Sequence, residues 1–342
     1  MDFREHQDMA RRISRRIWIA YLILFVLTAV LTGLFISSLF FIDDVPPDVG
    51  LLAGIWKLIL LTLSDDEGLT LTITIAIVAM VIMGFSTLVG FFRNSNGHDV
   101  ARHFGGRLIS EGDPHLSIQE QRALNIVAEL SLAAGMSPPA LYVIPENTIN
   151  AFAAGRDREH AVVAVTQGAL DNFNREQLAG VIAHELGHIV NEDIKLNIRL
   201  AAFVLGFTSL LFVARMIFRQ AVFRRSHVFV KIVLLFISAG IAVIGLLSVL
   251  SGRILQSMMS RQREYLADAT AVQFTRHPQG LAGALRVIRD GGKSTLMNHP
   301  EAAEYSHAFL FKVNHSLFDT HPPIDERIRR LETRRDYGET PT

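Results

Sequence analysis

The run H-E-L-G-H at 184–188 contains the residues whose types and spacing are best suited to chemistry. On a helix, His184 and His188 project from one face, at a spacing suited to a single metal ion. Glu185 then lies beside a water molecule on that metal, where a carboxylate can act as a base. The alternative is two unrelated surface histidines, but the residues around them, 178–190, are mostly apolar. Unpaired imidazoles would be costly there, so the run predicts a metal site.

A catalytic zinc ion needs a third protein ligand, with one position left for water. The chain has no cysteine, so that ligand is a His, Asp or Glu residue. In the run S-R-Q-R-E-Y-L-A-D at 260–268, Glu264 is the candidate ligand. Asp268 lies one helical turn later, where it can accept an N–H from a zinc-bound histidine. The residues alone leave a second interpretation open, a solvated acid pair beside Arg261 and Arg263.

Short-range signals predict the elements that must hold these residues. Ser117 and Glu120 form a capping box, and Asn174 with Gln177 repeats that pattern ahead of the H-E-L-G-H run. Gly135 supplies the C-terminal stop of the first helix. The predicted elements are helices over 118–134, 175–191, 254–274 and 324–335, with strands over 141–144 and 161–165 that flank the segment 150–155. The third helix is expected to begin after Gly252.

Two long apolar runs precede these elements. Residues 17–42 and 69–92 carry no charge, and each run exceeds the ~20 residues that a helix needs to cross the hydrocarbon core. The first run is longer than the apolar part of a signal peptide, and no cleavage site follows it, so it should stay attached. Arginines precede it and acidic residues follow it. The positive-inside rule therefore places the N-terminus and the region after residue 92 in the cytoplasm.

Two further apolar runs, 200–214 and 232–250, indicate a hairpin. Five basic residues separate them, and full crossing would put these residues outside, against the positive-inside rule. The first run is also only about 22 Å long as a helix, against a hydrocarbon core of about 30 Å. We therefore expect the hairpin to enter the membrane only partway, from the cytoplasmic face. Full crossing and buried helices of a soluble domain are the alternatives.

The composition agrees with a membrane protein. The 342 residues are 50% hydrophobic and only 19% charged, and the mean hydropathy is +0.30. A soluble domain has about 25% charged residues. The 33 basic and 33 acidic residues balance, so there is no overall positive field to attract nucleic acid. We expect no nucleic-acid partner.

Four motifs follow one another in an order that carries a family resemblance. They are N-A-F-A-A-G at 150–155, H-E-L-G-H at 184–188, E-x-x-x-D at 264–268 and T-H-P-P-I-D-E-R-I at 320–328. With the two leading apolar helices and the hairpin between the second and third motifs, the chain resembles the HtpX-type membrane zinc metalloproteases. The resemblance extends from about residue 17 to residue 331. One position departs from it, since Ala154 stands where the family's element has Thr.

The resemblance implies a fold class and a ligand set. The fold would be a mainly α membrane protein with two to four transmembrane helices and a cytoplasmic α+β zincin-like metalloprotease domain. One zinc ion per chain would be held by His184, His188 and Glu264. Glu185 would be the general base of a gluzincin-type enzyme, and Asp268 would be the acid behind a histidine ligand.

Two further roles complete the predicted site. His321, just before a Pro-Pro pair, resembles the family's histidine near the site and is the candidate for stabilising an oxyanion. Weaker candidates for that role are Tyr265, Tyr305 and His315. The segment at 150–155 should form or adjoin a sheet edge, to which an extended substrate can add through backbone hydrogen bonds. The residues predicted to bind substrate are Asn150, Ala151, Phe152 and Ala153.

The predicted function is hydrolysis of peptide bonds in membrane proteins or unfolded polypeptides, at the cytoplasmic face of a bacterial inner membrane, in membrane protein quality control. One alternative is a CaaX-type prenyl-protein endopeptidase, which shares the HExxH and ExxxD chemistry but usually has more spanning helices. The other is a scaffold that keeps zinc for structure. Glu185 argues against the scaffold, because a closed structural site has no use for a base.

The predicted organisation places the catalytic domain on both sides of the hairpin in the sequence. The order is a basic cytoplasmic N-terminus (1–16), a first transmembrane helix (17–42), an external loop (43–68), a second transmembrane helix (69–92), the first catalytic part (93–199), the apolar hairpin (200–250) and the second catalytic part (251–342). The expected partners are the polypeptide substrates and the lipid bilayer, and the sequence indicates no particular oligomeric state.

Overall fold

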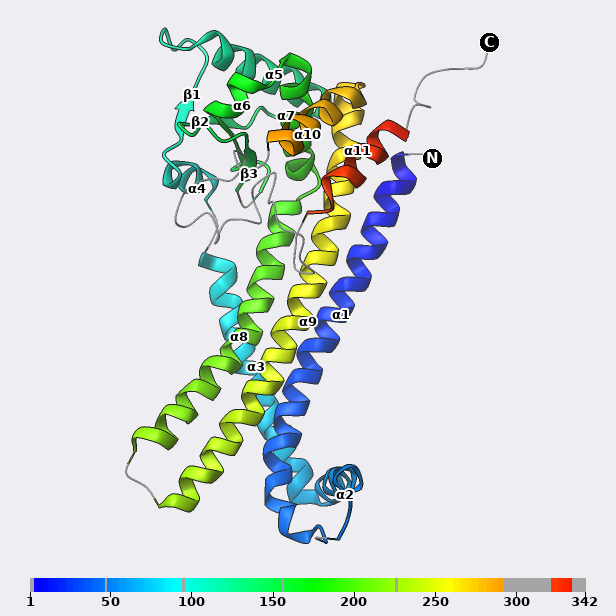
Figure 1. Cartoon of the computed structure of the whole chain (residues 1–342), viewed down its shortest axis with the longest axis vertical. Helices are drawn as coiled ribbons and strands as arrows, with labels where there is room; N and C mark the ends of the chain where they lie inside the picture. The colour runs from blue at the N-terminus through cyan, green and yellow to red at the C-terminus, as the bar shows by residue number, and fades with distance from the viewer. Residues whose placement is uncertain are drawn as a thin grey trace. The chain divides into compact units, whose positions relative to one another are not determined.

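A computed structural model describes residues 3–46, 48–93, 96–155, 157–224, 227–291 and 321–333. The chain divides into two compact units. One, the membrane unit, consists of residues 15–93 and 199–255. The other, the catalytic unit, consists of residues 1–14, 94–198 and 256–342. Figure 1 labels the helices and strands of both units.

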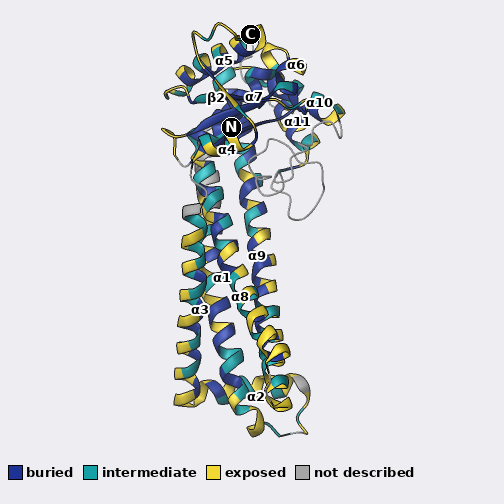
Figure 2. Ribbon diagram, turned by 90° about the vertical axis from the view of Figure 1, so that its left-hand side faces the viewer, coloured by how far each residue is buried: buried dark blue, intermediate teal, exposed yellow. Residues whose placement is uncertain are grey.

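The helices of the membrane unit follow the apolar runs of the sequence. They are α1 (Phe3–Ser38), the 3-10 helix η1 (Leu39–Asp44), α2 (Leu51–Ser64), α3 (Asp66–Arg93), α8 (Asp193–Phe223) and α9 (Val228–Thr275). Among the described residues, α1, α3, α8 and α9 contribute four segments long and apolar enough to cross a membrane. Large apolar side chains are exposed along these helices, as the yellow faces in Figure 2 show. Such surfaces suit contact with lipid chains.

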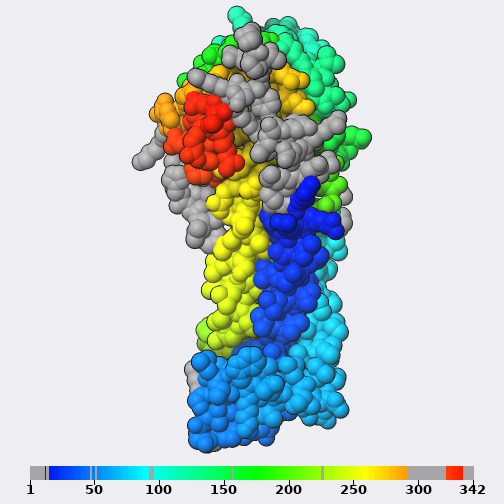
Figure 3. All heavy atoms as spheres, turned by 90° about the vertical axis from the view of Figure 1, so that its right-hand side faces the viewer, coloured from blue at the N-terminus to red at the C-terminus, as the bar shows by residue number. Residues whose placement is uncertain are grey.

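Close helix contacts hold the membrane unit together. A Cβ added at Gly33 of α1 would lie 2.3 Å from the carbonyl oxygen of Thr72 in α3. A Cβ added at Gly240 of α9 would lie 2.0 Å from the ring of Phe35 in α1. Helices α1 and α9 accordingly lie side by side (Figure 3). Glycines of this kind let helices pack closely in a membrane, where the hydrophobic effect does not drive helices together.

This packing bears on the depth of the hairpin. Gly240 lies against Phe35, in the second half of the first apolar run, and about 12 residues of α9 lie beyond it towards the tip. That length corresponds to about 18 Å of helix. Helix α8 spans 31 residues, although its uncharged stretch is still only the 15 residues 200–214. Among the described residues, α8 and α9 are both long and apolar enough to cross a membrane. The depth to which the hairpin enters the membrane stays a prediction.

Two elements of the membrane unit differ from the sequence-based prediction. Helix α2 lies within 43–68, where only an external loop was expected. Helix α9 is continuous through Gly252, although the sequence predicted that a separate helix begins after that glycine. Gly252 packs against the ring of Phe207, with an added Cβ 3.1 Å away. Its role is close helix contact and not helix termination.

The catalytic unit contains a four-stranded sheet in the order β1-β2-β4-β3. The strands are β1 (Arg107–Ile109), β2 (Ala140–Ile144), β3 (Ala151–Ala154) and β4 (Val162–Thr166). Strands β2 and β4 are parallel, whereas the β1–β2 and β3–β4 pairs are antiparallel. Because β3 pairs only with β4 in this sheet of described residues, β3 is an edge strand, as the sequence predicted for this segment.

Helices surround this sheet, and two of them start at the predicted caps. The helices are α4 (Gly97–His103), α5 (Ile118–Ala134), α6 (Gln167–Asn172), α7 (Arg175–Val190), α10 (Pro278–Gly291) and α11 (Ile324–Thr333). Both capping boxes are present, at Ser117 before α5 and at Asn174 before α7. Gly135 ends α5 in the left-handed conformation, with φ 65°. The main core joins one sheet face to α5, α7 and α10.

Candidate metal and catalytic site

Helix α7 carries the first three residues of the site. Its capping box at Asn174 starts the helix, and His184, Glu185 and His188 follow on its buried C-terminal half. The two imidazoles meet through their Nε2 atoms, 3.2 Å apart. His184 is buried, whereas 15% of the His188 side chain is exposed. The histidines thus converge on one point, as the spacing predicted.

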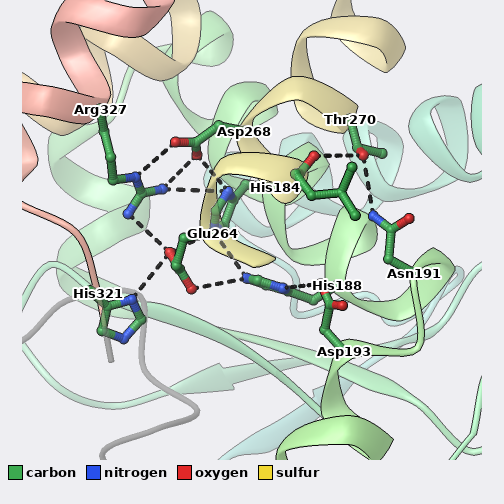
Figure 4. Close-up of polar contacts among 10 residues, drawn as sticks. His184, His188, Asn191, Asp193, Glu264, Asp268, Thr270, His321 and Arg327 are labelled. Atoms are coloured by element: carbon green, nitrogen blue, oxygen red, sulfur yellow. Dashed lines mark hydrogen bonds and ion pairs between the residues drawn. The ribbon is translucent and has the colours of Figure 1, made fainter. Parts of the chain in front are cut away.

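Helix α9 brings Glu264 to the same point. Its carboxylate oxygens lie 3.6 Å from His184 Nε2 and 3.5 Å from His188 Nε2 (Figure 4). The close approach of α7 and α9 depends on Gly187, because an added Cβ would lie only 3.3 Å from the backbone of Ala267. Glycine at the fourth position of H-E-L-G-H therefore has a packing role.

The three side chains fit a metal ion. Ligand atoms of His184, His188 and Glu264 all lie within 4.8 Å of one another. Two imidazole nitrogens and one carboxylate oxygen form a known ligand set for catalytic zinc. Glu264 and Asp268 are both buried, so the interpretation as a solvated acid pair is wrong.

Asp268 and Arg327 lie behind His184. The Asp268 carboxylate is 2.9 Å from His184 Nδ1, which leaves Nε2 directed at the other candidate ligands. Arg327 of α11 is fully buried and donates two hydrogen bonds to Asp268, at 2.7 and 2.9 Å. Its third nitrogen lies 3.2 Å from Glu264. Arg327 was not singled out from the sequence, although it is part of the T-H-P-P-I-D-E-R-I motif.

Asp193 and Arg263 lie behind His188. The Asp193 carboxylate is 2.9 Å from His188 Nδ1, and Arg263 lies 3.1 Å from the other Asp193 oxygen. Sequence reasoning did not select Asp193. It treated Arg263 only as a neighbour of a solvated pair. The only signal in the sequence was the position of Asp193, five residues after the second histidine.

His321 lies at the site, beside Glu264. Its Nδ1 is 3.1 Å from a Glu264 oxygen, and its Nε2 is buried without a hydrogen-bond partner in the described part of the chain. Tyr265 is engaged elsewhere, since the Arg330 guanidinium stacks 3.7 Å from the centre of its ring. Tyr305 and His315 lie outside the described residues. His321 is therefore the better placed of the candidate donors that the structure describes.

Glu185 faces strand β3. Its carboxylate accepts a hydrogen bond from the backbone N–H of Ala153, so β3 reaches the site. Burial raises the pKa of Glu185 above its usual value, despite the opposing effect of the two histidines. Asn150 directly precedes β3 and makes hydrogen bonds to the backbone and to β4. Its side-chain oxygen accepts from the Ala151 N–H, and its own backbone N–H donates to the Thr166 hydroxyl.

The neighbouring carboxylates raise the pKa of both histidines. Burial lowers the pKa of His188, but its hydrogen bonds with Asp193 and Glu264 outweigh burial and hold the pKa well above its usual value. His184 follows the same balance, with Asp268 and Glu264 opposing burial. The surrounding negative charge therefore favours a cation at this point, whether a proton or a metal ion.

Comparisons with known proteins identify a family and relatives of the chain. Residues 117–335 match peptidase family M48. A "Protease HtpX homolog" of Lactobacillus helveticus is 40% identical over 219 residues, covering 61% of this chain and 72% of the relative. One from Caldanaerobacter subterraneus is 42% identical over 220 residues, covering 61% and 70%. One from Tropheryma whipplei is 34% identical over 266 residues, covering 75% and 84%.

A solved structure is also similar, the crystal structure of S. mikatae Ste24p. The match has a TM-score of 0.43 and 18% identity, and it covers 92% of this chain and 66% of that one. The apolar helices and the family match define the chain as a multi-pass membrane metalloprotease. It belongs to peptidase family M48, among the HtpX-type membrane metalloproteases.

Proposed function

We propose that this metalloprotease is a zinc-dependent endopeptidase of the HExxH gluzincin type, which hydrolyses peptide bonds in membrane proteins during quality control. The observation that carries the proposal is the convergence of His184, His188 and Glu264, with Glu185 on the same helix turn. A zinc ion held by these three ligands would polarise the substrate carbonyl and lower the pKa of a bound water molecule.

The chain's own residues supply the proton transfers. Glu185 accepts the proton of the attacking water and then delivers it to the nitrogen of the leaving amine. Its raised pKa suits both directions of transfer, because the protonated form is closer in energy than for an exposed glutamate. His321 lies beside Glu264 through its Nδ1, and its Nε2 has no hydrogen-bond partner among the described residues, so this N–H serves as donor to the developing oxyanion.

Strand β3 is the proposed substrate platform. An extended peptide would pair with its outer edge through backbone hydrogen bonds, so selection by sequence would be weak. Supporting this, the backbone hydrogen bond between Ala153 and the Glu185 carboxylate brings β3 to the site. A pocket bordered by Gly155, His188 and Lys195 lies where β3 ends.

The wild-type chain and Glu185→Gln together test the proposal. We expect wild type to hold about one zinc per chain and to hydrolyse casein. Glu185→Gln should keep its zinc but lose nearly all hydrolysis, because the ligands are intact and only the base is gone. Turnover within tenfold of wild type would remove Glu185 from the mechanism. Zinc without any hydrolysis in wild type would favour the scaffold, and preference for a prenylated C-terminal peptide would favour the CaaX enzyme.

We also propose that the catalytic unit faces the cytoplasm of a bacterial cell, from the inner membrane. The basic N-terminus and the acidic 43–68 region support this orientation through the positive-inside rule. Single cysteines at Gln220 and Phe223 test the hairpin in this cysteine-free chain. Full crossing predicts labelling by an impermeant maleimide from outside intact cells. Protection there, with labelling from the cytoplasmic side, would support the predicted partial entry.

A further inference from the structure

Asp193 is held between a candidate metal ligand and an arginine. One carboxylate oxygen lies 2.9 Å from His188 Nδ1, and the other lies 3.1 Å from Arg263. The carboxylate is almost completely buried, with 1% of the side chain exposed. A charged group this deep in the protein is tolerated only when other groups compensate it. The contacts with His188 and Arg263 therefore compensate the charge of the buried Asp193 carboxylate.

The backbone is shaped to bring Asp193 back to His188. In an unbroken helix, residues five apart point about 140° away from each other. Helix α7 ends at Val190, and Glu192 takes the left-handed conformation with φ 56°. This conformation is unfavourable for a residue with a side chain. The resulting turn places Asp193 at the start of α8, beside the histidine (Figure 4).

The same arrangement occurs on the other histidine. His184 Nδ1 meets Asp268 at 2.9 Å, and Asp268 is bound by Arg327. Each imidazole thus has a carboxylate at Nδ1 and presents Nε2 to the shared point. A carboxylate at Nδ1 keeps the proton on that nitrogen and leaves the Nε2 lone pair for a metal.

We propose that Asp193, held by Arg263, is a positioning residue that fixes the tautomer and ring orientation of His188 for metal binding. The inference rests on the proposed zinc site. Arg263 directly precedes Glu264, so the contact also links the segment that carries the third ligand to the second histidine. Asp193 contacts neither substrate nor metal in this role, and it acts through His188 alone.

The test measures zinc affinity by competition with a chelator, using the full chain in detergent. Asp193→Ala should weaken zinc binding by about 10–100-fold. Asp193→Asn should recover part of the affinity, because its amide oxygen can still accept the Nδ1 proton. Arg263→Ala should lose less affinity than Asp193→Ala. Asn191→Ala is the matched control, since Asn191 donates to Thr270 and links α7 to α9 without touching His188.

A second measurement separates positioning from a general structural role. Cobalt bound in place of zinc reports ligand geometry in its visible absorption spectrum. We expect an altered spectrum for Asp193→Ala and a wild-type spectrum for Asn191→Ala, each recorded below the unfolding temperature of the metal-free protein. Wild-type affinity in Asp193→Ala would overturn the inference, as would equal losses in Asp193→Ala and Asn191→Ala. If wild type itself bound no zinc, the proposed function would be wrong. If wild type bound zinc and Asp193→Ala bound it equally well, only the role of Asp193 would be wrong.

Discussion

Buried polar side chains differ in kind between the two units. In the catalytic unit, the interior holds the ionisable groups Glu185, Glu264, Asp268, Asp193 and Arg327. In the described part of the membrane unit, the buried polar side chains other than Tyr21 are Ser and Thr hydroxyls. The Tyr21 hydroxyl itself donates to the backbone carbonyl of Gly252, at 2.6 Å.

The difference follows from the cost of each group. A buried ion needs partners that compensate its charge, and most of the partners here lie far away in the sequence. Losing one partner leaves the other charge unpaired in a low dielectric. A hydroxyl in a helix can donate to the carbonyl four residues earlier, so it carries its own partner. Substitutions should therefore have large effects in the catalytic unit and small effects in the membrane unit. Four predictions test that contrast.

Glu264→Ala should have the largest effect. It removes one of three candidate ligands and leaves two histidines, which is too few for a stable zinc site. We expect zinc content to fall below about a tenth of wild type, with loss of hydrolysis. Metal analysis of the purified chain measures the first effect, and casein cleavage measures the second. Equal zinc content in variant and wild type would mean that the third ligand is another residue.

Arg327→Met should destabilise the protein strongly. It leaves Asp268 and Glu264 buried without their arginine, and breaking a buried pair costs about 3–5 kcal/mol. Arg330→Met is the control on the same helix, because Arg330 is half exposed and its pair with Glu326 contributes about 1 kcal/mol or less. Unfolding of the metal-free proteins in denaturant compares them. Similar midpoints for both variants would show that the buried network does not depend on Arg327.

Sequence reasoning succeeded for the features of the fold that depend on local signals. The starts of α5 and α7 were predictable because each cap and its partner lie three residues apart. The apolar runs identified four long helices, because a helix that contacts lipid can be recognised from the length and apolar composition of its sequence. The sequence also predicted two of the strands and the edge position of 150–155. Local signals sufficed for all of these.

What sequence reasoning missed depends on contacts between distant residues. Arg327 lies 59 residues from Asp268 and 143 from His184, and no periodic pattern reports such a pair. Asp193 needed the left-handed turn at Glu192, which has no glycine to announce it. Gly252 was interpreted as a helix boundary because its packing partner, Phe207, is on another helix. In each case the residue type was visible and its partner was not.

His321→Phe should have an intermediate effect, on catalysis alone. Loss of one oxyanion donor lowers kcat by about 10²-fold, while the three zinc ligands remain. Steady-state kinetics and zinc content measure the two quantities separately. His321→Gln keeps an N–H donor and should recover part of the rate. An unchanged kcat in His321→Phe would end the oxyanion role. A loss of zinc would indicate instead that His321 holds Glu264 in position for metal binding.

The smallest effect is expected inside the membrane unit, between Thr28 of α1 and Ser248 of α9. Their hydroxyl oxygens are 2.8 Å apart, and each also lies within hydrogen-bond distance of a carbonyl oxygen in its own helix, that of Leu24 or Ile244. Two hydroxyl protons cannot serve three contacts at once, so deleting one hydroxyl leaves the other with its helical carbonyl. A double-mutant cycle of Thr28→Val and Ser248→Ala should therefore give a coupling of about 0.6 kcal/mol in unfolding free energy. A coupling above about 2 kcal/mol would exceed the known range for such pairs. The membrane unit would then depend on its polar pairs much as the catalytic unit depends on its ions.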